Sequence, residues 1–152
     1  MTLSDATLLA VAHQFGTPTY VYDEAAVRRQ CSRLRALLAG LPVELLYAMK
    51  ANSNPALLRI IQDEGFGVDA VSPGEMLLAL RLGWSPEAIL FSANMMSDAE
   101  MHMAVEAGVL LNIGELTRLE AFGEAYPGSR VCVRLNPRFG AGHHAHVVTA
   151  GG

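Results

Sequence analysis

The fold is decided by residues 43–71, which read VELLYAMKANSNPALLRIIQDEGFGVDAV. This stretch begins and ends with an apolar run, and between them Leu57, Leu58 and Ile61 share one face of a segment that is polar on its other face. Such alternation is typical of βα units, whose strands pair in parallel. We therefore expect a strand, a helix over 55–64 and a second strand.

The same unit recurs along the chain. Strands are predicted at 43–49, 67–71, 88–91, 109–113 and 130–135, and they begin 21 to 24 residues apart. Five units are more than half of an eight-unit barrel, although five strands also fit an open doubly wound sheet. The spacing predicts an α/β fold with helices between the strands.

Helix ends are marked where these units require them. Capping residues precede three helices and glycines follow three; they are Ser53 or Asn54, Ser72 and Ser97 at the starts, and Gly65, Gly83 and Gly108 at the stops. Residues 19–22 alternate as a half-buried strand does, and an arginine-rich helix is predicted from 24 to about 39. This first strand need not belong to the same sheet.

Composition excludes several classes of protein. The chain has 152 residues, 51% of them hydrophobic and 17% charged, so it is not a disordered chain. Its net charge of -4 disfavours nucleic-acid binding. No segment predicts a membrane span or a secretory signal, and the two cysteines, Cys31 and Cys132, are interpreted as packed thiols of a reduced, cytoplasmic protein.

Lys50 is the only lysine, whereas the other ten basic residues are arginine. It closes an apolar run that is predicted to be a buried strand. Only an amine can deprotonate and attack a carbonyl, so a nucleophilic role is one interpretation. The alternative is a lysine whose stem lies along the strand end while its ammonium reaches solvent.

Two further charged residues lie at predicted strand ends. Asp69, near the end of the second strand, is interpreted either as a site carboxylate beside Lys50 or as a turn and helix-capping residue. Arg134 lies in the fifth apolar run and, judged alone, is best explained as half of a buried ion pair.

Histidines and methionines cluster in two places. His143, His144 and His146 lie in a glycine-rich segment without companion cysteines or spaced carboxylates, so no metal site is predicted. Four methionines are interpreted as core residues; these are Met95, Met96, Met101 and Met103.

Four motifs, in order, resemble the fold type III pyridoxal-phosphate decarboxylases. The segment YAMKAN at 47–52 resembles their cofactor-lysine segment, and FGTP with YVYD at 15–23 is similar to the amino-terminal signature of diaminopimelate decarboxylases. GFGVD at 65–69 resembles their second barrel strand, and RLNP at 134–137, with His144 and Thr149 after it, their fifth. Alanine racemases share the fold but differ after the lysine.

The resemblance implies a fold, a cofactor and an activity. The fold is a partial (β/α)8 TIM-type barrel of the alanine racemase-like type, with residues 1–40 contributing a strand to a separate β domain and residues 41–152 forming five βα units. The cofactor is pyridoxal 5'-phosphate, with Lys50 as the catalytic Schiff-base lysine and Asp69 and Arg134 as cofactor-binding residues. The reaction is decarboxylation of meso-2,6-diaminopimelate to L-lysine.

Other possibilities stay open. A related decarboxylase of the ornithine, arginine or carboxynorspermidine type fits the barrel motifs, and a non-catalytic cofactor-binding or regulatory remnant fits the missing glycine-rich phosphate loop and β domain. We expect the chain to be a fragment, truncated or completed by a partner, because the fifth strand has no return helix and family chains are more than twice as long. The resemblance also implies a homodimer in the complete protein.

Overall fold

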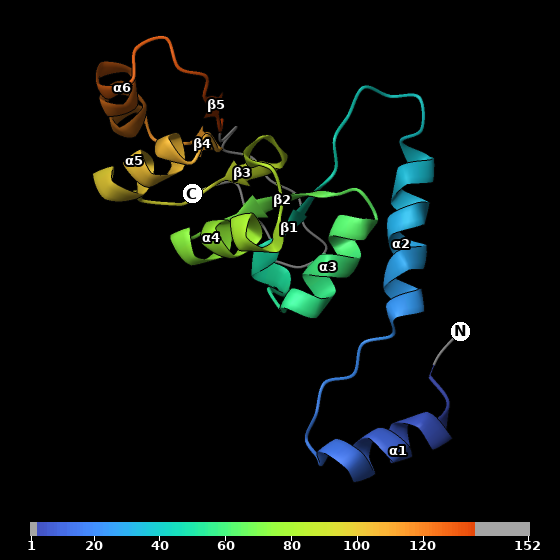
Figure 1. The fold of residues 1–152 in the computed structure, drawn as a ribbon. Helices are drawn as coiled ribbons and strands as arrows, with labels where there is room; N and C mark the ends of the chain where they lie inside the picture. Colours follow the sequence, from blue (N-terminus) through green and yellow to red (C-terminus); the bar gives the residue numbers. More distant parts are fainter. Residues whose placement is uncertain (1–2, 136–152) are drawn as a thin grey trace, which may run out of the picture.

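The computed structural model describes residues 3–135 and contains six α-helices, two short 3-10 helices and one parallel sheet (Figure 1). In chain order the elements are α1 (Asp5–Phe15), α2 (Glu24–Leu37), β1 (Leu46–Ala48), η1 (Met49–Ala51), α3 (Pro55–Asp63), β2 (Gly67–Ala70), α4 (Pro73–Leu82), η2 (Pro86–Ala88), β3 (Ile89–Phe91), α5 (Asp98–Glu106), β4 (Leu110–Ile113), α6 (Leu116–Ala125) and β5 (Cys132–Val133).

Strand order decides between the two predicted architectures. The five strands are parallel and lie in the order β1-β2-β3-β4-β5, so each βα unit adds its strand on the same side of the one before. A doubly wound sheet would reverse direction at a switch point, whereas sequential order is the order of a (β/α)8 barrel. The barrel prediction is therefore confirmed for the part of the chain that the structure describes.

The main core lies between the sheet and the helices that follow its strands. Strand residues alternate, with Val68, Ala70 and Phe91 fully buried on the helix side. They belong to one continuous cluster with residues of α4, α5 and α6, for example Met76 and Phe122. Because one cluster covers one face, the opposite face of the strands is left half-buried, and this second face carries the polar side chains discussed below.

The predicted helix boundaries are confirmed. Asn54, Ser72 and Ser97 each accept a backbone hydrogen bond as the cap of α3, α4 and α5, and Ser97 forms a full capping box with Glu100. Gly83 ends α4 in the left-handed conformation, with φ of 96°. Local sequence therefore determined where these helices start and stop.

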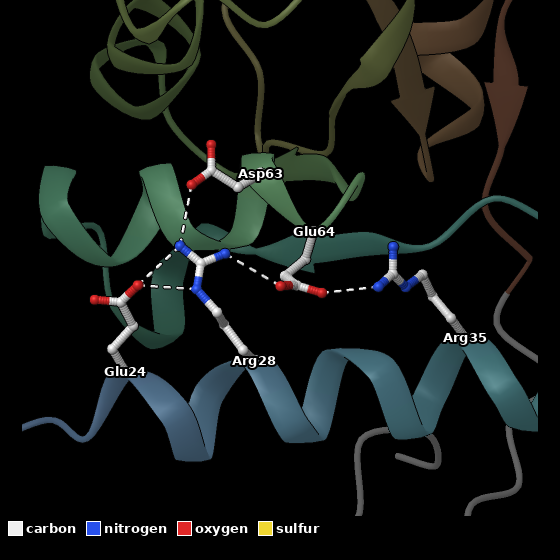
Figure 2. Close-up of polar contacts among 5 residues, drawn as sticks. All are labelled: Glu24, Arg28, Arg35, Asp63 and Glu64. Carbon is white, nitrogen blue, oxygen red and sulfur yellow. Dashed lines mark hydrogen bonds and ion pairs between the residues drawn. The ribbon is translucent and has the colours of Figure 1, made fainter.

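Helix α2 is held against α3 by ion pairs and by a small apolar cluster. Arg28 donates to Glu24 at 2.8 Å and to Asp63 and Glu64 at 3.1 Å, while Arg35 donates to the other oxygen of Glu64 at 2.8 Å (Figure 2). The Glu24 carboxylate, followed by the other two, raises the pKa of Arg28 above its ordinary value. The arginines of α2 thus join segments that are about 30 residues apart in sequence.

Beneath these ion pairs, Cys31 of α2 packs against Ile61 and Phe66. Cys31 is 5% exposed, and burial raises the pKa of its thiol. The prediction of a packed thiol is confirmed for Cys31, whereas Cys132 in β5 is only half-buried.

The amino-terminal segment differs from the prediction. Helix α1, capped by Ser4, was not expected and buries no residue. Residues 19–22 form no strand, because a strand needs a hydrogen-bonded neighbour and none pairs with them among residues 3–135. Tyr20 is 91% exposed there. Whether residues 1–40 contribute a strand to another domain stays a prediction.

Two further expectations were wrong. The strands are shorter than predicted, and β1 is not buried on both faces, since Leu46 is 37% exposed. Met95 is not a core residue: it is 84% exposed and has a positive φ of 51°, while Met96 and Met101 are buried as expected.

Within the described residues, no helix is both long and apolar enough to cross a membrane.

Candidate active site

The three predicted site residues lie at the carboxyl ends of strands. Lys50 is the second residue of η1, directly after β1, Asp69 is the third residue of β2, and Arg134 directly follows β5. In a parallel sheet these ends share one edge, which is the edge where barrel enzymes carry their chemistry. No hydrogen bond or ion pair within residues 3–135 joins the three side chains directly.

Lys50 lies in a turn and not in a buried strand. Its side chain is exposed, whereas the preceding Met49 is fully buried in the main core. The apolar run predicts an ammonium at the end of a buried strand; the chain instead leaves the strand after Ala48 and enters η1. The amine is therefore accessible to a small molecule without the cost of burying a charge.

The turn that carries Lys50 is closed by a side chain. The hydroxyl of Tyr47 donates to the backbone oxygen of Asn52 at 3.1 Å and so bridges the four residues between them. The Tyr47 ring packs on both apolar clusters of the protein. Burial, with a smaller contribution from Tyr22, raises the pKa of Tyr47, so its hydroxyl stays a protonated donor at neutral pH.

Two asparagines continue the turn into α3. Asn52 accepts from the backbone of Asn54, and Asn54 accepts from the backbone of Ala56, both at 2.9 Å. These are side-chain turns that suit asparagine, and Pro55 then starts the helix. The motif around Lys50 is therefore a rigid strand-to-helix connection in which most polar groups have a structural role.

Asp69 lies on the face of the sheet opposite the helices. Its neighbours Val68 and Ala70 are buried in the core, so alternation puts its side chain on the second face, in register with Ala48 of β1 and Leu90 of β3. The oxygen Oδ1 of Asp69 is buried and has no hydrogen-bond partner among the described residues. A buried acceptor without a donor is costly, and a bound cationic nitrogen would satisfy it.

The capping interpretation of Asp69 is wrong. Ser72 caps α4 by accepting from the backbone of Glu75, and Glu75 in turn accepts from the backbone of Val71 at 2.8 Å. These two bonds fix the loop after β2 without any contribution from Asp69. Its carboxylate is consequently free of a local structural role.

Arg134 is exposed, which excludes the buried ion pair considered from the sequence. Its backbone N–H donates to the oxygen of Ile113 at 2.8 Å, which extends the pairing of β5 with β4 by one bond. The side chain lines a small cleft at the carboxyl ends of β3 and β4, together with Ser92 and Asn112. In this cleft Asn112 donates to Ser92 at 3.2 Å.

Sequence reasoning missed Ser92 and Asn112, and it assigned no role to Tyr47. Asn112 is the one polar side chain in the apolar run of β4, which is a signal that alternation could have used. The strand-end position of Ser92 was visible as well. Four other residues that carry the resemblance to the fifth-strand region lie outside the described residues; they are Asn136, Pro137, His144 and Thr149. His143 and His146 lie outside the described residues as well.

The functional groups of Lys50, Asp69 and Arg134 are of the types that pyridoxal phosphate requires. An accessible amine, a carboxylate oxygen that lacks a donor, and an exposed guanidinium lie along one edge of the sheet. The cofactor has an aldehyde that an amine could bind, a protonated ring nitrogen that a carboxylate could accept from, and an anionic group that a guanidinium could contact.

Comparison with known proteins identifies the family of the chain. Residues 24–152 match the family described as "Pyridoxal-dependent decarboxylase, pyridoxal binding domain". The chain is 40% identical to the diaminopimelate decarboxylase of Methanothermobacter thermautotrophicus and 35% identical to that of Escherichia coli K12, with 98% of this chain covered in both cases. It spans 36% and 35% of their lengths, about a third.

Solved structures are similar over the same part. A crystal structure of diaminopimelate decarboxylase superposes with a TM-score of 0.81 at 35% identity, covering 91% of this chain and 32% of that one. The lysine/ornithine decarboxylase of Vibrio vulnificus complexed with putrescine gives 0.75 at 29% identity, covering 88% of this chain and 38% of that one. The chain therefore belongs to the pyridoxal-dependent decarboxylases and carries sequence of their pyridoxal-binding barrel domain.

Proposed function

We propose that this chain is the amino-terminal portion of a pyridoxal-phosphate-dependent decarboxylase that converts meso-2,6-diaminopimelate to L-lysine. The observation that carries the proposal is the position of the only lysine. Lys50 lies exposed on a turn after β1 that the Tyr47 hydroxyl closes, and the adjacent strand β2 holds a buried carboxylate oxygen that has no partner among residues 3–135. An amine beside such a carboxylate is what a cofactor with an aldehyde and a cationic nitrogen requires.

Each of the three residues has a distinct role in this proposal. Lys50 would hold the cofactor through its side-chain amine, Asp69 would accept a hydrogen bond from a cationic nitrogen, and Arg134 would contact the cofactor from the far end of the sheet. Pyridoxal phosphate, when bound, supplies the electron sink that makes loss of an α-carboxylate possible. These residues of the protein contribute position and charge.

The proposed substrate is supported by the relatives rather than by the described residues. Diaminopimelate decarboxylases match nearly the whole chain at 32% to 40% identity. The lysine/ornithine decarboxylase of Vibrio vulnificus matches at 29% identity, so a diamine-forming reaction is the second candidate. Comparing kcat/KM of the complete protein for diaminopimelate and for ornithine distinguishes the two, and a preference for ornithine would contradict our proposal.

Two properties of the complete protein belong to the same proposal. We expect it to be a homodimer that works in the cytoplasm on a small amino acid. The sparse cysteines and the bacterial and archaeal relatives support the compartment. Sedimentation of the complete protein checks the oligomer.

Covalent trapping tests the role of Lys50. The chain is incubated with pyridoxal phosphate and reduced with borohydride, and the modified peptide is identified by mass spectrometry. We expect stoichiometric modification at Lys50 and its loss in Lys50→Ala, because no other side-chain amine exists in the chain. The amino terminus is the only competing amine, and its modification is counted separately.

The control for charge is Lys50→Arg, which keeps the cation but offers no nucleophile at accessible pH. Modification of the wild-type chain confined to the amino terminus would contradict the proposed role of Lys50. Binding of the cofactor to Lys50→Arg as strongly as to the wild type would contradict a covalent role.

A further inference from the structure

The apolar packing of Tyr47 does not explain why this residue carries a hydroxyl. The ring is half-buried at the junction of the two apolar clusters, so a phenylalanine would fill the same space. The hydroxyl instead reaches past η1 to the backbone oxygen of Asn52, at 3.1 Å. It therefore closes a loop whose only exposed functional group is the Lys50 amine.

The loop is fixed at both ends and in its middle. Tyr47 belongs to β1, which pairs with β2 through Tyr47 and Val68, and Asn52 is tied to the start of α3 through its bond from the Asn54 backbone. Between them Met49 is fully buried. Lys50 is consequently presented by a turn that has little freedom to move, apart from its own side-chain rotation.

We propose that Tyr47 is a positioning residue, whose hydroxyl holds the Met49–Ala51 turn in the conformation that presents the Lys50 amine to pyridoxal phosphate. The inference rests on the proposed function of Lys50. Tyr47 does not touch the cofactor in this proposal; it acts through the backbone of Asn52. Preorganisation of this kind lowers the cost of ordering that binding would otherwise impose.

The substitution Tyr47→Phe removes only the hydroxyl and keeps the buried ring. The matched control is Tyr126→Phe, which also deletes a bonded hydroxyl, in this case the partner of His102 at 2.9 Å, away from the carboxyl edge. Two quantities are measured on the whole 152-residue chain. One is the equilibrium constant for the borohydride-trappable adduct with pyridoxal phosphate, and the other is hydrogen exchange of the amides from Met49 to Asn52.

We expect Tyr47→Phe to lower the adduct equilibrium constant about fivefold, the factor that a typical hydrogen bond contributes to an equilibrium. Amide exchange in the Met49–Asn52 segment should accelerate by a similar factor, while exchange in β3 and β4 stays as in the wild type. Tyr126→Phe should change neither quantity at the Lys50 turn. If Tyr47 had only a structural role, Tyr47→Phe would accelerate amide exchange throughout the sheet and leave the adduct equilibrium constant unchanged.

The outcomes separate the two proposals. If the wild type forms no adduct at Lys50, the proposed function fails and this inference falls with it. If the wild type forms the adduct and Tyr47→Phe forms it equally well, the function stands and the positioning role is overturned. Weaker adduct formation without faster exchange in the turn also overturns it, because the effect would then not pass through the Asn52 backbone.

Discussion

At the scale of single residues, Asp69 shows a cost that the fold leaves uncompensated. Its Oδ1 is buried on the second face of the sheet and has no donor within the described part of the chain, although Ser72 and Glu75 satisfy the backbone of the adjacent loop. Native proteins tolerate few such atoms, and those they keep commonly lie at functional sites. Stability alone gives no reason for a carboxylate here.

The substitution Asp69→Asn therefore separates stability from binding. We expect the free energy of unfolding to change by less than about 1 kcal/mol, because the Oδ1 of Asp69 has no hydrogen bond to lose within residues 3–135. The adduct equilibrium with pyridoxal phosphate should fall about tenfold, since a charge-assisted hydrogen bond to the cofactor becomes a neutral one. Urea unfolding and borohydride trapping measure the two quantities.

Asp5→Asn is the control, because Asp5 lies in the first turn of the exposed helix α1. Asp69 has no cofactor role if Asp69→Asn traps the cofactor as completely as Asp5→Asn does. A large loss of stability in Asp69→Asn alone would instead identify a native partner for the carboxylate.

At the scale of elements, helix starts are determined locally. The capping box of α5 pairs Ser97 with Glu100: the Ser97 hydroxyl accepts from the Glu100 backbone at 3.3 Å, and the Glu100 carboxylate accepts from the Ser97 backbone at 2.8 Å. The bonds from the Ser97 backbone and then from its hydroxyl lower the pKa of Glu100. These interactions need nothing beyond four consecutive residues.

The substitution Ser97→Ala should lower the free energy of unfolding by about 1 kcal/mol at neutral pH. A carboxylate with a lowered pKa stabilises the fold above its unfolded-state pKa, about 4.3, and that stabilisation is lost as the pH falls through the lower folded value. The difference between wild type and variant should therefore shrink in acid. Denaturant unfolding at several pH values checks this.

Ser85→Ala is the matched control, because Ser85 precedes η2 without a side-chain capping bond. Its effect should be small and independent of pH. An equal loss of stability in both serine variants would show that the capping box of α5 contributes nothing specific.

At the scale of the whole molecule, stability is concentrated in the sheet and the helices packed on it. Helix α1 buries no residue, and Figure 1 shows it apart from the sheet, whereas Phe91 of β3 is completely buried. The single tryptophan, Trp84, lies in the same core and donates to the backbone oxygen of Phe66 at 2.8 Å. Its fluorescence therefore reports the unfolding of that core.

We expect deletion of residues 1–15 to change the free energy of unfolding by less than about 0.5 kcal/mol, as for exposed substitutions. Phe91→Ala should lower it by about 3–5 kcal/mol, because a large core cavity forms. Trp84 fluorescence in a urea titration measures both. A large loss of stability on deletion would show that α1 packs on the core in solution.

Much of the molecule could be predicted because it depends on neighbours in sequence. The alternation of apolar runs predicted the five strands, and Asn54, Ser72 and Ser97 start their helices as expected. The segment 19–22 forms no strand within residues 3–135, because alternation reports a preference, whereas a strand also needs a partner. Helix α1 was not predicted, although Ser4 caps it as Ser72 and Ser97 cap their helices.

The repeated βα unit and the single lysine after the first strand could be predicted from the amino-acid sequence, since periodicity, caps and composition are local properties. The sequential strand order, the exposure of Lys50 and Arg134, and the burial of an Asp69 oxygen that has no donor within residues 3–135 follow only from the folded chain. The physical reason is that strand order and burial depend on contacts between segments 20 or more residues apart, which a local pattern does not encode.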